Sequence, residues 1–358
     1  MKKKVFLNNL ITYGMVIAAY IICQTLISNG SMSRSMKGQL VPICVYVVMA
    51  ISLNLVVGIS GELSLGHAGF MSIGAFTGTV CSAWLLSAFQ LENTVVRLIL
   101  CMVVSGVVAG GFGVLIGIPV LRLRGDYLAI VTLAFGEIIR NLVNCIYINI
   151  EEGGLLHFGF NNPNLPGKAV LAGPKGTVSV AKIATFGMGF VLILFTLFVV
   201  LNLINSRSGR AIMATRDSRI AAESVGINVT KYKMMAFVTA AALAGMAGAL
   251  YGLNYSTVNA TKFKFDTSIL VLVFVVLGGI GSIRGSIIAA TLLTILPEVL
   301  RAFSDYRMLV YAVVLIAVML TTNSTALGAK IDTIKSKYRH MKKKRAKARA
   351  AQKEGNKA

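Results

Sequence analysis

The sequence has few charged residues, fewer acidic than basic ones, and almost no tryptophan. Charged residues make up 13% of the 358-residue chain, which contains 13 acidic residues, 35 lysines and arginines, and one tryptophan. Soluble domains ordinarily have about 25% charged residues, so this composition excludes an ordinary soluble domain. In their place 56% of the residues are hydrophobic, and the mean hydropathy is +0.77. Apolar runs of membrane-spanning length repeat along the chain, which predicts a polytopic helical membrane protein.

Motifs for common chemistry are also missing. No GxxxxGK[ST] phosphate-binding loop occurs, so the chain does not hydrolyse nucleotides by that route. The three histidines, His67, His157 and His340, are too scattered to suggest a metal site by themselves. The cysteines each lie inside an apolar run and form no CxxC pair: Cys23, Cys44, Cys81, Cys101 and Cys145. We therefore expect a protein that is not an enzyme and that binds neither a metal nor a cofactor.

The apolar runs predict an all-α membrane protein with about ten transmembrane helices, some of them broken by glycines. The runs are 11–27, 40–58, 68–88, 95–120, 127–148, 183–204, 234–255, 268–277, 287–300 and 308–322. The first run follows a basic start, as in a signal peptide, but no small-residue cleavage pattern follows it, so we favour an uncleaved span. Lysine and arginine concentrate in cytoplasmic loops. Their distribution places both termini and the loop 206–233 in the cytoplasm and the loop 151–182 outside.

Two segments are predicted to lie outside the membrane in addition to the loop 206–233. The loop 151–182 is rich in Gly, Asn and Pro, and it is either a plain surface loop or a receiver for an external partner. A basic tail, 328–358, follows the membrane domain, 1–327, and could bind RNA or anionic lipid. We favour a solvated, disordered tail beside the anionic membrane surface. Membrane lipid is therefore an expected partner and nucleic acid is not.

The segment 206–233, called the central segment below, is the only long charged stretch between two apolar blocks. Basic residues predominate in it, and small apolar residues recur at roughly helical spacing up to Gly226, a helix stop. A short cytoplasmic helix with a face of small residues would fit a groove in another protein. The alternative is a solvated loop that only sets topology.

Two glycine-rich clusters interrupt the apolar runs. In the first, 58–78, the glycines are too close together for an ordinary lipid-facing helix, and Glu62, Ser64 and His67 add polar groups near membrane depth. This predicts either a broken or re-entrant element beside a translocation path, or a cytoplasmic turn followed by a packed helix. The second cluster, 277–285, echoes the first and indicates a weak internal repeat, which is typical of transporters.

Further glycines and ionisable residues lie inside the predicted spans. Two GxxxG pairs, 106–110 and 113–117, favour close contact with another helix. Glu137 and Arg140 stand at i, i+3, which favours an internal ion pair over direct substrate contact. The residues predicted to line a translocation path are Glu62, Ser64, Gly66, His67, Gly69, Glu137, Gly278, Gly279 and Gly281.

Four stretches in order, 53–76, 121–143, 206–252 and 276–290, carry a family resemblance. The chain resembles the membrane permease subunits of branched-chain amino acid ABC transporters, of the LivM type. The resemblance implies a subunit of a bacterial plasma-membrane importer. Its expected partners are a homologous LivH-type permease, two cytoplasmic ATPases that hold ATP and Mg²⁺, and an extracytoplasmic substrate-binding protein.

The central segment is similar to the EAA coupling motif of that family. Ala221, Ala222 and Gly226 match the motif, whereas Ile220 stands where the family has Glu. This departure weakens any argument from a specific salt bridge to an ATPase, but not one from the shape of the helix. The residues that the resemblance implies for ATPase coupling are Arg216, Asp217, Ala221, Ala222, Glu223 and Gly226.

Three other functions stay open on the sequence. The same scaffold is expected to serve importers of urea or short amides. A secondary transporter driven by Na⁺ or H⁺ could use Glu62 and Glu137 as coupling sites. A purely structural membrane anchor would tolerate bulky residues in the glycine clusters.

Overall fold

The computed structural model describes residues 2–30, 32–123, 125–151, 153–178 and 180–300, together with six single residues between 306 and 316. Most of the predicted span 308–322 and all of the basic tail 328–358 lie outside the described residues. The chain divides after Glu298 into two compact units, the first of which is formed by residues 1–298.

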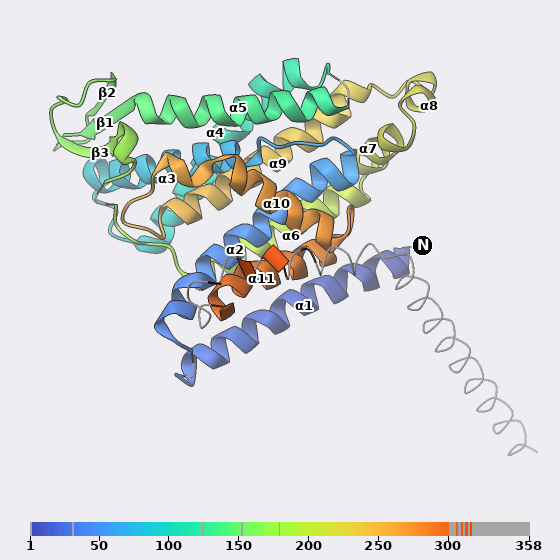
Figure 1. Ribbon diagram of the computed structural model, residues 1–358, viewed down its shortest axis with the longest axis horizontal. Coiled ribbons are helices and arrows are strands. Elements are labelled where there is room, and N and C mark those ends of the chain that lie inside the picture. The colour runs from blue at the N-terminus through green and yellow to red at the C-terminus, as the bar shows by residue number, and fades with distance from the viewer. Residues whose placement is uncertain are drawn as a thin grey trace, which may run out of the picture. The chain divides into compact units, whose positions relative to one another are not determined.

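Helices dominate this unit (Figure 1). They are α1 (Lys2–Ser28), α2 (Arg34–Asn54), α3 (His67–Phe89), α4 (Thr94–Val120), α5 (Asp126–Cys145), α6 (Phe186–Asn205), α7 (Arg207–Asp217), α8 (Arg219–Ser224), α9 (Val229–Gly252), α10 (Phe265–Gly278) and α11 (Ile283–Val299). Among the described residues seven are long and apolar enough to cross a membrane: all except α7, α8, α10 and α11. The predicted spans 268–277 and 287–300 correspond to α10 and α11, which are shorter, at 14 and 17 residues. The predicted polytopic helical fold is confirmed.

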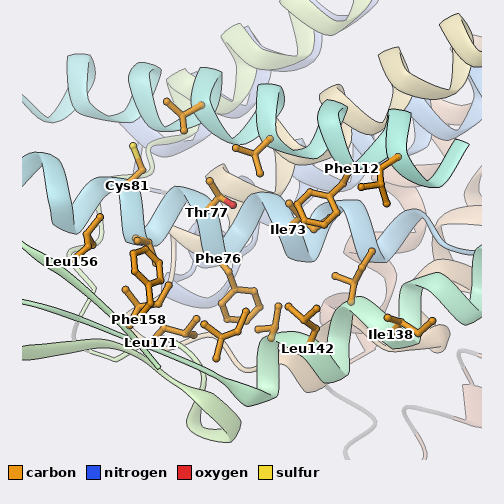
Figure 2. Close-up of a pocket in the computed structure, with 18 of the residues that line it drawn as sticks. Ile73, Phe76, Thr77, Cys81, Phe112, Ile138, Leu142, Leu156, Phe158 and Leu171 are labelled. Carbon is orange, nitrogen blue, oxygen red and sulfur yellow. The ribbon is translucent and has the colours of Figure 1, made fainter. Parts of the chain in front are cut away.

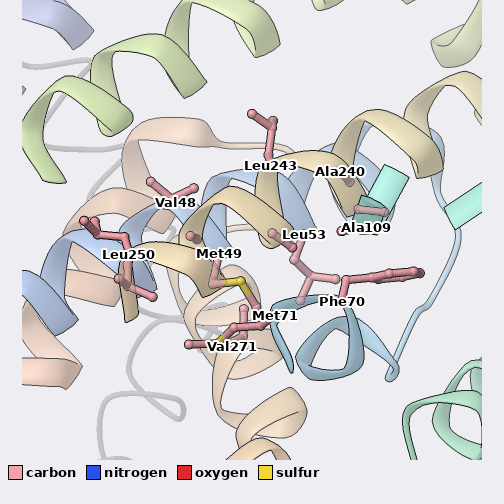
Figure 3. Packing of buried hydrophobic residues seen from close by; sticks show 14 of the residues in the cluster. Val48, Met49, Leu53, Phe70, Met71, Ala109, Ala240, Leu243, Leu250 and Val271 are labelled. Carbon is pink, nitrogen blue, oxygen red and sulfur yellow. The ribbon is translucent and has the colours of Figure 1, made fainter. Parts of the chain in front are cut away.

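The core forms around α9, whose Ala- and Gly-rich surface lets α2, α3 and α4 approach closely. A Cβ on Gly74 of α3 would lie 2.0 Å from the Gly245 carbonyl oxygen of α9, so these two backbones touch. The predicted GxxxG pairs of α4 also face α9: a Cβ on Gly113 would lie 2.8 Å from the Cβ of Ala241. Figure 3 shows Leu243 and Leu250 of α9 among side chains from α2, α3, α4 and α10. Small residues thus allow dense packing where burial of apolar area alone gives little advantage in lipid.

The helices differ in how much of their surface the chain covers. The apolar window of α2 is 89% buried, whereas that of α1 is 11% buried and that of α5 is 28% buried. In Figure 1, α1 and α5 lie along opposite edges of the unit, with α2 and α9 between them. The uncovered faces of α1 and α5 are therefore left for lipid or for another subunit.

A small sheet follows α5, which the sequence analysis did not predict. Its strands are β1 (Ile146–Ile150), β2 (Leu156–Phe160) and β3 (Lys168–Ala172), paired antiparallel in the order β2-β1-β3. The predicted fifth span, 127–148, was too long at its end, because the helix stops at Cys145. The stretch Ile-Tyr-Ile-Asn-Ile alternates β-branched residues with a period of two, which favours a strand over a helix.

The central segment contains two helices, α7 and α8, where we predicted one. The break falls at Ser218, whose extended backbone (φ −154°, ψ 110°) ends α7 and whose hydroxyl accepts from the Ala221 N–H at the start of α8. Serine competes with the helix for its backbone hydrogen bonds, so it favours caps over helix interiors. Gly226, with φ +80°, follows the end of α8, as the sequence predicted.

Candidate functional site

The first glycine cluster is the end of a long helix and a turn. After Asn54, α2 continues as a π-helix, Leu55–Ser60, which stops at Gly61 with φ +77°. The N–H groups of Gly61 and Glu62 both donate to the Val56 carbonyl, and non-helical backbone leads on to α3. The alternative of a turn followed by a packed helix describes this geometry. π-helical turns are rare and often mark functional sites.

The second glycine cluster is a tight corner between α10 and α11. Gly279 and Gly281 have φ of +91° and +83°, which other residues rarely adopt. A Cβ on Gly285 would lie 1.6 Å from the Gly278 carbonyl oxygen, so the two helices meet backbone to backbone. Glycine is thus required at 279 and 281 by the backbone conformation, and at 278 and 285 because a side chain would not fit.

The two glycine clusters contact each other, and Asn54 joins them. Asn54 Oδ1 accepts from the Gly281 N–H at 2.9 Å, and its Nδ2 donates to Ser286 Oγ at 2.8 Å. Both side chains are fully buried. A Cβ on Gly58 would lie 2.4 Å from the Gly281 nitrogen, so the backbones of the two clusters are in contact. We call this arrangement the crossing.

Neither Asn54 nor Ser286 was among the residues predicted from the sequence. The available signal was a lone amide in the apolar run VVMAISLNLVVG, because polar groups inside a membrane span are rare and need partners.

The start of α3 is tied to its neighbours by buried polar contacts. His67, itself buried, places Nε2 2.8 Å from Ser52 Oγ of α2. The Ala68 N–H donates to Ser268 Oγ of α10 at 3.1 Å. The predicted path residue Ser64 is buried too, and its hydroxyl has no hydrogen-bond partner within the described part of the chain. The start of α3 is therefore fixed to both α2 and α10 by buried polar groups.

Helix α5 covers the turn between α2 and α3. Thr132 Oγ1 accepts from the Leu65 N–H at 3.0 Å, and a Cβ on Gly66 would lie 2.2 Å from the Thr132 carbonyl oxygen. A Cβ on Gly69 would lie 3.0 Å from Gly136 Cα. Gly66 and Gly69 thus allow the backbone of α5 to come close, which explains their lack of side chains.

The predicted ion pair within α5 is present. Arg140 Nε donates to Glu137 Oε2 at 2.7 Å. The side chain of Arg140 is 20% exposed and that of Glu137 is 33% exposed. The pair is therefore not sealed in the core, although the chain covers most of each side chain.

The central segment contacts the first cluster at two points. Arg216, in the last turn of α7, donates from Nη1 to the Gly58 carbonyl oxygen at 2.8 Å. Lys233, near the start of α9, forms an ion pair with Glu62, and these side chains are only 13% and 14% exposed. Glu62, predicted to line a path, is therefore engaged with the central segment.

The residues of α8 divide into an inner and an outer face. Ala222 is 3% exposed and packs inside the chain, so of the two alanines expected to face a partner only Ala221 is exposed. The outer face instead carries Ile220 and Val225, 82% and 73% exposed, next to exposed Ala221. Glu223 pairs with Arg219 at 2.8 Å at the surface. The position of Ala222 follows from the break at Ser218, which turns α8 relative to α7.

An apolar cavity of about 610 Å³ lies between α3, α4, α5 and the sheet (Figure 2). In that view Phe76 of α3 extends toward Leu142 of α5, while Ile73 and Thr77 lie on the side of α3 toward α4. The Thr77 hydroxyl is one of its few polar groups, and no charged side chain is among the lining residues. The cavity suits an acyl chain or an apolar side chain, but it cannot neutralise the charges of a zwitterion.

A second cavity, of about 1030 Å³, lies between the end of α3 and the sheet, with Glu151 and Lys168 in its lining. No group of three or more His, Cys, Asp or Glu residues that could hold a metal ion occurs in the described ranges.

The model of the family described as "Branched-chain amino acid transport system / permease component" matches residues 35–319, which include both glycine clusters and the central segment. The chain belongs to this permease family. No solved structure matches the chain significantly.

Curated relatives of this permease include both subunit types. It is 34% identical over 310 residues to the LivM permease protein of Salmonella typhimurium, an alignment that covers 77% of this chain and 66% of that protein. It is 25% identical over 266 residues to a probable LivM of Methanocaldococcus jannaschii, covering 67% and 74%. It is 26% identical over 294 residues to the LivH permease protein of S. typhimurium, covering 79% and 91%. The chain thus spans slightly less than two thirds of the length of the LivM proteins of S. typhimurium and Escherichia coli.

The permease brings most of the predicted site residues together, although they fall into two groups. Gly278, Gly279 and Gly281 belong to the corner at the crossing, and Glu62, four residues after Gly58, pairs with Lys233. Gly66 and Gly69 instead contact α5, the helix that also carries Glu137. Of the residues predicted for ATPase coupling, Arg216 and Ala222 face inward, while Ala221 and Gly226 are exposed. The crossing joins interrupted helices, which is the arrangement that transporters use to change shape around a path.

Proposed function

We propose that this chain is one transmembrane subunit of an ATP-driven importer of branched-chain amino acids in the bacterial inner membrane. A second, LivH-type permease pairs with it, two cytoplasmic ATPases hold ATP and Mg²⁺, and an external binding protein delivers the substrate. The printed names of the LivM and LivH relatives support the substrate class and the pairing of two permeases.

The outer face of α8 is the observation that supports docking of separate ATPase subunits on this permease. Ile220 and Val225 are large apolar side chains left almost fully exposed on a short helix between basic flanks. A polar surface loop has no need of such a pair, whereas a helix that docks into an apolar cleft of another protein does. The ATPases are the proposed occupants of this face, and Ile220 makes the contact where the family has a Glu.

The uncovered sides of α1 and α5 support the remaining contacts of the subunit. The apolar cavity beside α5 opens among exposed apolar residues such as Leu115 and Phe158, which suits lipid or the partner permease. Substrate passes along the crossing rather than through this cavity, because the lining of the cavity offers nothing to hold an ammonium or a carboxylate.

The test is Ile220→Arg in the co-expressed complex, with Ile220→Leu as the matched control. Burying an unpaired charge in a docking cleft costs several kcal/mol, which is enough to weaken a micromolar contact beyond detection. We expect normal membrane insertion and pairing with the second permease, loss of the ATPases from the purified complex, and loss of ATP-driven leucine uptake in proteoliposomes. The control should retain all of these.

Two results would contradict the proposal. Both ATPases retained at normal stoichiometry by Ile220→Arg, with substrate-stimulated hydrolysis, would remove α8 from the docking surface. ATP-dependent uptake of urea or short amides in place of leucine by the unmodified complex would show that the scaffold is right and the substrate class wrong.

A further inference from the structure

The guanidinium of Arg216 faces into the permease and away from the outer face of α8. Nη1 donates to the Gly58 carbonyl oxygen at 2.8 Å, while Nε and Nη2 donate to Asp217 Oδ1 at 3.1 and 2.9 Å. The side chain of Arg216 is 39% exposed and that of Asp217 is 68% exposed. Three nitrogen atoms of the Arg216 side chain thus donate hydrogen bonds within the chain. The two bonds to Asp217 hold the guanidinium in one orientation.

The Gly58 carbonyl is a group that needs such a donor. The last carbonyls of a helix have no intrahelical N–H partner, and a cation near a helix C-terminus is favoured by the helix dipole. Gly58 lies in the last turn of the interrupted helix, where Gly61 and Glu62 already direct their N–H groups to Val56. Arg216 therefore caps this helix end from a segment that is 158 residues away in the sequence.

The cap is fitted to the glycines beneath it. A Cβ on Gly61 would lie 2.5 Å from Arg216 Cγ, so the aliphatic part of the arginine rests on a residue that has no side chain and has φ +77°. The ion pair of Lys233 with Glu62 fixes the next residue of the chain to the start of α9. Two cations that flank α8 are thus attached to a stretch of five residues, 58–62.

On the other side, Gly58 lies against the second cluster. Its Cα faces the backbone of Gly281, and Gly281 is held by Asn54 from the same helix. A movement of the central segment therefore reaches the second cluster through one backbone contact, with Arg216 as the first link.

We propose that Arg216 is a positioning residue: it fixes the interrupted end of α2 to the central segment, so that a partner that displaces α8 moves the crossing. This inference rests on the proposed function for the identity of that partner. It assigns to Arg216 and Asp217, both expected from the family resemblance to serve ATPase coupling, the transmission of movement within the chain. The outer face of α8, with Ile220 and Val225, makes the partner contact and Arg216 does not.

The test compares Arg216→Gln and Arg216→Lys with Arg210→Gln, a substitution of an exposed arginine in the same helix whose Nη1 donates locally to the Asn205 carbonyl oxygen. In the purified complex, Arg216→Gln should keep both ATPases and go on hydrolysing ATP. Leucine uptake should fall about tenfold or more, since a charge-assisted hydrogen bond is lost. Arg216→Lys should restore part of the uptake, and Arg210→Gln should leave it unchanged. Loss of the ATPases, or unchanged uptake in Arg216→Gln, would overturn the proposal.

A measurement without ATPases separates this inference from the proposed function. Spin labels at Leu63 and Ser224, both exposed, report the distance between the first cluster and α8 in the permease alone. We expect a narrow distance distribution in the unmodified chain and in Arg210→Gln, and a clearly broader one in Arg216→Gln. Equal widths in all three would contradict the link whatever the complex transports. A broader distribution in Arg216→Gln, together with no ATP-driven uptake by the unmodified complex, would support the role of Arg216 in fixing the first cluster to the central segment. The same result would contradict the proposed import function.

Discussion

The two glycine clusters are alike in sequence but are held in different ways. The first, at the end of α2, is bonded by Arg216 and Lys233 of the central segment and is covered by Thr132 of α5. The second, between α10 and α11, is a corner closed on itself, with Gly278 against Gly285. Its side-chain hydrogen bonds across the crossing come from Asn54 of α2.

The difference indicates a direction of control. Displacement of the central segment acts on the first cluster directly, since two cations are attached there, whereas the second cluster follows through its contact with the first. The first end is π-helical and flanked by a non-helical turn, whereas the corner has little room to change. We therefore regard the first cluster as the driven element and the second as the element that it moves.

The largest effect should come from adding a methyl group where the backbones touch. In Gly58→Ala the new Cβ would lie 2.4 Å from the Gly281 nitrogen, and in Gly285→Ala 1.6 Å from the Gly278 carbonyl oxygen, so backbone must move in either case. We expect both variants to lose uptake and to insert or fold poorly, as judged by detergent-soluble yield and thermal stability. Gly111→Ala is the control, because a Cβ there meets nothing within 4 Å. Normal uptake in Gly58→Ala would mean that the two clusters do not need their close contact.

A smaller effect is expected from the ion pair on α5, which lies away from the crossing. Glu137→Ala leaves Arg140 without its partner, so it should reduce leucine uptake more than Glu137→Ala/Arg140→Ala does. Because both side chains are partly exposed, the loss should be about fivefold or less. Equal losses in the single and double variants would give Glu137 a direct role in transport, and α5 would then belong to the path as much as the clusters do.

Local patterns in the sequence predicted the local features of the fold. Hydropathy located the seven described helices that are long and apolar enough to cross a membrane. The GxxxG spacing marked the face of α4 that meets α9, and the i, i+3 spacing predicted the pair of Glu137 with Arg140. Each of these depends on residues within one or two helical turns, so the sequence contains the required information.

Features that depend on distant residues or on a helix break were missed. The bond of Asn54 to Gly281 joins residues 227 positions apart, and no local spacing indicates such a partner. The inward position of Ala222 depends on the break at Ser218, which a continuous helical periodicity did not reveal. The strand Ile146–Ile150 could have been predicted from its alternation, but it follows an apolar helix directly and was read as its continuation.

The most direct test of the link between the central segment and the crossing is a double-mutant cycle on leucine uptake by the reconstituted complex. Asn54→Ala removes the bonds from α2 to Gly281 and Ser286, and Arg216→Gln removes the cap on Gly58. Substitutions at independent sites act additively in free energy, so their fold reductions multiply. If the two contacts hold one mechanical unit, the double variant should transport little worse than the poorer of the two single variants. Fold reductions that multiply in the double variant would show that the central segment and the second cluster act separately, contrary to this account.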